Sequence, residues 1–145
     1  GQLASRIGRK KTILFGCALL AAMFLTFYFL TTLYSTIHPV MFVCFALVGF
    51  AWAAINVNSL PMVLEMCRGS DIGKFTGYYY TATFSAQIAT PIIYGIVRML
   101  TGTYMSLFYY CPIAFILSTL CILVVRHGEA IPDEIVEKIK EENED

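Results

Sequence analysis

Long uncharged stretches alternate with short charged segments along this chain. Residues 12–35, 40–62 and 104–125 contain no Asp, Glu, Lys or Arg, and residues 75–100 contain Arg98 as their one charged side chain. About 20 apolar residues are needed to cross the hydrocarbon core of a bilayer as a helix. Each stretch reaches that length, so the pattern predicts an all-α integral membrane protein with four transmembrane helices at these positions.

The composition agrees with a membrane protein. Hydrophobic residues make up 58% of the chain, charged residues 14%, and the mean hydropathy is +0.70. A soluble domain usually carries about 25% charged residues, so a soluble globular protein is excluded. The chain divides into a loop motif over residues 1–11, a four-helix transmembrane region over residues 12–126, and an acidic tail over residues 127–145.

The cations are distributed asymmetrically. Nine of the ten Lys and Arg residues precede the first stretch, lie between the second and third, or follow the fourth, while residues 36–39 and 101–103 contain none. Cytoplasmic loops of membrane proteins carry an excess of Lys and Arg. We therefore expect both termini of this segment, and its middle loop, to be cytoplasmic in a multi-pass protein of the inner or plasma membrane. The lipid bilayer is the expected partner, and nothing indicates nucleic acid.

The residues that support enzyme chemistry are missing from the sequence. There is no Ser/His/Asp set and no nucleotide-binding loop, and the five cysteines and two histidines lack metal-ligand spacing. We therefore expect no enzyme activity, no catalytic residue, no metal and no cofactor. A coupling ion, H⁺ or Na⁺, is expected to bind outside this segment, because Glu65 is the one acid close to a predicted span.

Two charged motifs carry a family resemblance. Residues 1–11 read Gly-Gln-Leu-Ala-Ser-Arg-Ile-Gly-Arg-Lys-Lys, which resembles the major facilitator loop signature G-x-L-A-D-R-x-G-R-[KR]-[KR], with Ser5 in place of Asp. Residues 60–73 resemble the P-x-x-x-E-x-x-x-R-G-x-x-x-G pattern at the end of the tenth helix, with one residue fewer between Glu65 and Arg68. The resemblance implies a partial major facilitator bundle, helices nine to twelve, whose partners are the missing N-terminal helices of the same transporter.

Residues 54–96 contain the pattern Asn-x-Asn-Ser-x-Pro followed by Gly-x-x-x-Gly-Tyr-Tyr-Tyr. This pattern looks closest to the glycoside–pentoside–hexuronide and sucrose symporters. This resemblance implies a fragment of a secondary active transporter that binds a small-molecule substrate and performs cation-coupled sugar or glycoside symport by alternating access. Drug or small-metabolite efflux by a major facilitator is an open alternative, and a non-transporting membrane scaffold is an alternative of another class. Polar side chains at mid-membrane depth weigh against the scaffold.

The resemblance also implies a cytoplasmic gate, in which loop arginines bind acidic groups at helix ends. Glu65 is the only acid in the first 70 residues, so it is the expected partner of Arg9 or Arg6. Arg68 lies three residues further on and can share a helix face with Glu65. The predicted gate therefore consists of Arg6, Arg9, Glu65 and Arg68. The alternative is a solvated charge cluster that only sets the topology.

Polar side chains within the spans are candidates for the substrate path, because in hydrocarbon they tend to face cavities or neighbouring helices. Gln87 lies near the middle of its span, the depth at which transporters bind substrates. Aromatic rings beside amides and hydroxyls would suit a sugar, although helix packing is the alternative for such faces. Spacings of four and three place each candidate set on one helix face. The first set is Tyr80, Phe84, Gln87 and Tyr94, in a stripe that also contains Pro91 and Arg98, and the second is Trp52, Asn56 and Ser59.

Small residues recur where the third span begins. Gly69, Gly73 and Gly77 follow one another at a spacing of four. Small residues at this spacing allow helix backbones to approach closely in a bilayer, where van der Waals packing drives association. We expect these glycines to form a helix-packing face.

Overall fold

A computed structural model gives the fold of residues 8–34, 36–67 and 69–125. The predicted acidic tail and most of the predicted loop motif lie outside these described residues, as do the predicted gate residues Arg6 and Arg68.

Four long helices make up nearly all of the described structure, which contains no strand. Each contains or closely matches one of the predicted stretches, so the all-α membrane class is confirmed. Short 3₁₀ turns, η1 and η2, precede the third and fourth long helices. The elements are α2 (Arg9–Leu33), α3 (Val40–Leu64), η1 (Gly69–Asp71), α4 (Ile72–Thr101), η2 (Tyr104–Ser106) and α5 (Leu107–Val124).

The four helices are not equally suited to lipid. The segments Arg9–Leu33, Val40–Leu64 and Tyr104–Val124 are each long and apolar enough to cross a membrane, and α4 is not among them. Its 30 residues correspond to about 45 Å of helix, so length is not its limitation. Gln87, Arg98 and several hydroxyl-bearing side chains lower its hydropathy instead.

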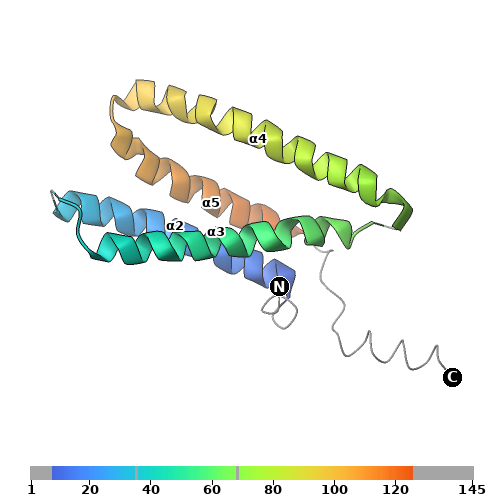
Figure 1. Ribbon diagram of the computed structural model, residues 1–145. Helices are drawn as coiled ribbons and strands as arrows, with labels where there is room; N and C mark the ends of the chain where they lie inside the picture. The colour runs from blue at the N-terminus through green and yellow to red at the C-terminus, as the bar shows by residue number, and fades with distance from the viewer. Residues whose placement is uncertain (1–7, 35, 68, 126–145) are drawn as a thin grey trace.

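The helices pack unevenly (Figure 1). Helices α2 and α3 lie side by side, α5 lies beside α2, and α4 runs along the outside, joined to α3 at one end and to α5 at the other. None of the residues of α4 is buried. Two clusters at opposite ends of the α2 interface form the core. One contains Ile13, Cys17 and Met62, and the other contains Phe27, Met41 and Cys44.

Small residues do bring two helices together, but not where the sequence suggested. A Cβ added to Gly16 of α2 would lie 3.0 Å from the Ala51 carbonyl oxygen and 2.8 Å from Cγ1 of Ile55. The backbone of α2 therefore lies directly against α3, and Ala51 is fully buried.

The predicted glycine face makes no such contact among the described residues. A Cβ added to Gly69, Gly73 or Gly77 would meet nothing within 4 Å. These glycines lie at the start of α4 and in the turn before it, where α4 stands apart from its neighbours. Packing of this face against further helices stays a prediction.

The antiparallel order of the helices gathers charge at one end of the molecule. The start of α2, the end of α3 and the start of α4 all lie at this end, carrying Arg9, Glu65 and Lys74. At the opposite end, α4 stops at Gly102, whose positive φ of 68° forms a left-handed cap and whose N–H donates to the Arg98 carbonyl.

Candidate functional site

A cavity of about 670 Å³ lies between α3, α4 and α5, and we call it the central cavity. Its volume falls within the range of ligand pockets, about 300–1,000 Å³. Apolar and polar side chains from all three helices share the lining. The lining residues are Trp52, Ile55, Asn56, Ser59, Tyr79, Thr83, Ala86, Gln87, Thr90, Pro91, Tyr110, Cys111, Ala114, Phe115 and Ser118.

One of the two predicted polar faces lines this cavity in full, and the other contributes one residue. Trp52, Asn56 and Ser59 line it from α3, and Gln87 lines it from α4. The Asn56 side-chain amide donates to the Trp52 carbonyl at 3.0 Å, which restrains the amide along its own helix. The sequence offered the two faces as separate candidates, whereas the fold places Gln87 of the α4 face on the same cavity as the α3 face.

Three predicted substrate-path residues lie elsewhere on α4. The rings of Tyr80 and Phe84 stack on each other with centroids 5.8 Å apart, and both side chains are exposed. The Tyr94 hydroxyl donates to the Tyr104 carbonyl at 3.3 Å, where α4 turns into α5. Neither the stacked pair nor Tyr94 lines the central cavity. A substrate role for these aromatic residues stays a prediction.

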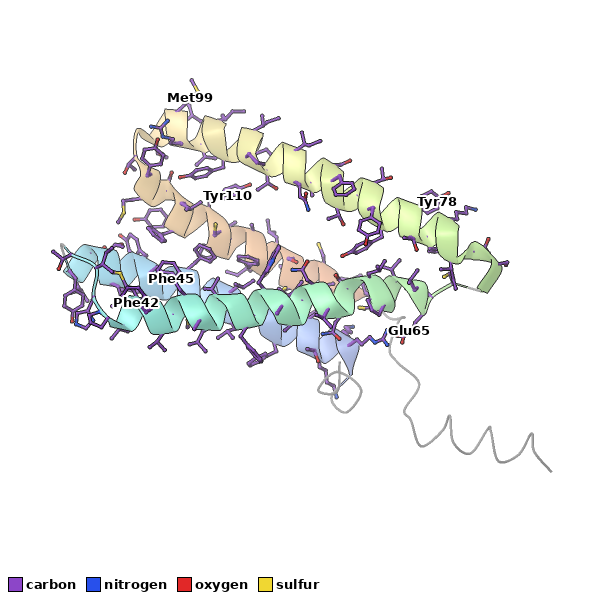
Figure 2. The ribbon with its side chains drawn as sticks, viewed as in Figure 1. Phe42, Phe45, Glu65, Tyr78, Met99 and Tyr110 are labelled. Carbon is purple, nitrogen blue, oxygen red and sulfur yellow. The ribbon has the colours of Figure 1, made fainter. Side chains whose placement is uncertain are left out.

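Sequence reasoning missed five cavity residues with hydroxyl groups: Tyr79, Thr83, Thr90, Tyr110 and Ser118. Figure 2 shows Tyr110 in the space between α4 and α5. Tyr79 and Thr83 precede Gln87 by eight and four residues, so the helical spacing that singled out the aromatic stripe also fits them. The Tyr79 and Ser59 hydroxyls share a hydrogen bond of 2.7 Å, which joins α4 to α3.

An ion pair joins α2 to α3 at the charged end of the molecule. Nη1 of Arg9 lies 2.6 Å from Oε1 of Glu65, and the two side chains are 25% and 28% exposed. Glu65 caps the end of α3, as Figure 2 shows, and Arg9 is the first residue of α2. The predicted partners are thus in contact, and the pair fastens the start of α2 to the end of α3.

The neighbouring cation has a different partner. Nζ of Lys10 donates to the Leu123 carbonyl at 3.0 Å and to the Val125 carbonyl. These carbonyls lie at the C-terminal end of α5, where helical carbonyls lack intrahelical donors and positive charge is favourable. Arg9 and Lys10 therefore attach the start of α2 to the end of α3 and to the end of α5, respectively.

Comparison with known protein families identifies the superfamily of this chain. The family model of the Major Facilitator Superfamily matches residues 1–143. The chain belongs to the Major Facilitator Superfamily. No solved structure matches it closely. Together with its apolar helices, the membership makes this facilitator a multi-pass membrane protein of a transporter superfamily, whose members are generally not enzymes.

A second cavity of the facilitator, of about 320 Å³, lies between the central cavity and the charged end, and we call it the basal cavity. Ile55, Ser59, Tyr79 and Ser118 line both cavities and form the wall between them. The remaining side chains are apolar or sulfur-containing. They are Ile13, Cys17, Met62, Val63, Met66, Ile122 and Val125.

Neither cavity offers a metal site. Across residues 8–34, 36–67 and 69–125, no group of three His, Cys, Asp or Glu side chains could hold a metal ion. The groups that face the two cavities are amides, hydroxyls, thiols, thioethers, hydrocarbon and aromatic rings. Such a lining binds ligands by hydrogen bonds and apolar contact.

Proposed function

We propose that this facilitator is a secondary active transporter for a sugar or glycoside, cation-coupled and working by alternating access. One observation carries the proposal: Trp52, Asn56 and Ser59 of α3 and Gln87 of α4 line a single central cavity. Sugars combine apolar C–H faces with rings of hydroxyls, and therefore need both kinds of contact.

The chemistry of the central cavity suits a sugar ring. The Trp52 side chain offers an aromatic surface against which C–H groups can pack. The Gln87 amide both donates and accepts hydrogen bonds, as do the hydroxyls of Ser59 and Tyr79. Each of these groups can form hydrogen bonds with ligand hydroxyls, so a ligand with several hydroxyls matches this lining better than an apolar one.

The charged end supplies the features of a cytoplasmic gate. Arg9–Glu65 and the Lys10 contacts fasten the ends of α2, α3 and α5, whereas α4 has no buried residue. In the proposal this end faces the cytoplasm, the remaining transporter helices complete the path, and the H⁺ or Na⁺ site lies among them. Arg6 and Arg68 belong to the same proposed gate.

The test is sugar uptake by the full-length facilitator with single substitutions on α4. Gln87→Ala removes a cavity amide, and we expect KM to rise about fivefold, because one hydrogen bond contributes about 1 kcal/mol. Ile88→Ala is the matched control, since Ile88 follows directly on the same helix, is 67% exposed and lines neither cavity. Equal KM values in the two variants, or no sugar uptake by the unmodified protein, would contradict the proposal.

A further inference from the structure

The basal cavity differs in chemistry from the central cavity beside it. Among its lining residues, polar oxygen atoms on side chains come only from Ser59, Tyr79 and Ser118, all of which stand in the shared wall. Beyond the wall, the lining consists of aliphatic side chains, methionines and Cys17. A ligand long enough to extend from the central cavity into the basal cavity would pass these three hydroxyls and reach an apolar space.

The hydroxyls of the wall lie where the two cavities adjoin. Ser59 and Tyr79 share their 2.7 Å hydrogen bond across the wall. The Ser118 hydroxyl lies 3.9 Å from the Cys17 thiol, on the side of the basal cavity. A hydroxyl can donate one hydrogen bond and accept two, so the wall has capacity left for an ether-type oxygen of a ligand.

The basal cavity selects against a second sugar ring. A hydroxyl placed beyond the wall would lose its water and find no partner oxygen or nitrogen on the apolar side chains, which costs affinity. An alkyl or aryl group gains affinity there instead, about fourfold for each buried methylene, since one methylene contributes about 0.8 kcal/mol. The volume of about 320 Å³ lies at the low end of ligand pockets, which favours a compact group.

We propose that the substrates of this facilitator are glycosides with a compact apolar aglycone. The sugar ring lies in the central cavity, the glycosidic oxygen lies at the Ser59–Tyr79–Ser118 wall, and the aglycone fills the basal cavity. The aglycone then points toward the Arg9–Glu65 end, because Val125 lines the basal cavity and its carbonyl accepts from Lys10. This inference rests on the proposed sugar site in the central cavity.

The test is competition against sugar uptake by the full-length facilitator, using methyl, ethyl, propyl and butyl glycosides of one transported sugar. We expect the inhibition constant to fall about fourfold with each methylene until the cavity is full. The 4-hydroxybutyl glycoside should bind at least about fivefold more weakly than the butyl glycoside, because its terminal hydroxyl is left unpaired.

Two valine variants on α3 separate binding in the cavity from partitioning into lipid. Val63→Phe places a ring in the basal cavity, whereas Val57→Phe makes the same change at a side chain that is 55% exposed and lines neither cavity. We expect the ratio of methyl to butyl inhibition constants to stay high in the Val57 variant and to approach one in the Val63 variant. Ile122→Thr, which places a hydroxyl in the basal cavity, serves the same purpose if Val63→Phe does not reach the membrane.

The outcomes distinguish this inference from the proposed function. If methyl glycosides compete but the inhibition constant does not depend on chain length, the sugar site stands and the aglycone site is overturned. If the dependence on chain length persists in both Val63→Phe and Ile122→Thr, the aglycone site is also overturned, because partitioning into the bilayer would then explain the dependence. If no sugar or glycoside competes at all, the proposed function fails and the inference fails with it.

Discussion

Arg9 and Lys10 are adjacent in the sequence yet fasten α2 to different helices. Arg9 contacts the Glu65 carboxylate on α3, and Lys10 contacts the last carbonyls of α5. The Arg9 contact could be predicted, because Glu65 is the only acid in the first 70 residues. The Lys10 contact could not, since a backbone carbonyl is present at every residue and only the fold decides which carbonyls come near.

Charge exchange tests the Arg9–Glu65 contact in the full-length facilitator. We expect Arg9→Glu and Glu65→Arg each to lower the uptake rate, because each places two like charges together, and the double exchange to recover part of it. The coupling should be about 1 kcal/mol at most, or about fivefold in rate, since the pair is partly exposed. Lys74→Glu, at the same end of the molecule, should show no such rescue by Glu65→Arg.

The positions of the helices were predictable because charge is expensive in lipid and is therefore absent from the spans. Four of the helix bounds lie outside the predicted stretches. The largest of these shifts are at two starts: α2 starts at Arg9 rather than residue 12, and α4 starts at Ile72 rather than residue 75. In α2 the extra turn is stabilised by the Arg9 and Lys10 contacts. Which helix faces meet was less predictable, because α2 and α3 carry apolar residues on every side and small residues on several sides.

Gly16 provides the test of how α2 meets α3. Gly16→Ala should destabilise the full-length facilitator by about 1–3 kcal/mol, because its Cβ would lie 3.0 Å from the Ala51 carbonyl and force the helices apart. The control is Gly49→Ala on α3, where an added Cβ would meet nothing within 4 Å. Thermal unfolding in detergent should show a lower midpoint for the first variant only. A midpoint lowered equally by both would point to the loss of glycine itself rather than to crowding.

In the whole molecule, hydropathy and two motifs were sufficient to predict the membrane class and the superfamily, and the family comparison confirms both. The candidate site was only partly predictable. Trp52, Asn56, Ser59 and Gln87 could be predicted because unpaired polar groups within a membrane span are energetically costly and therefore tend to face cavities or neighbouring helices. That they share one cavity depends on the rotation of α3 and α4, which the sequence pattern leaves open. The same rotation brings in Tyr79 and leaves Tyr80 outside.

The central claim is that the cavity between α3, α4 and α5 holds the substrate. The most direct test is labelling by a small aqueous thiol reagent in the full-length facilitator, with the native cysteines of this segment replaced, because Cys111 and Cys17 themselves line the cavities. We expect a cysteine introduced by Gln87→Cys to react and to be protected by transported sugar. A cysteine introduced by Ile88→Cys, a position that we expect lipid to surround in the full-length protein, should react slowly and without protection. The account would be contradicted if the Gln87→Cys variant were not labelled, or if saturating sugar did not change its labelling rate.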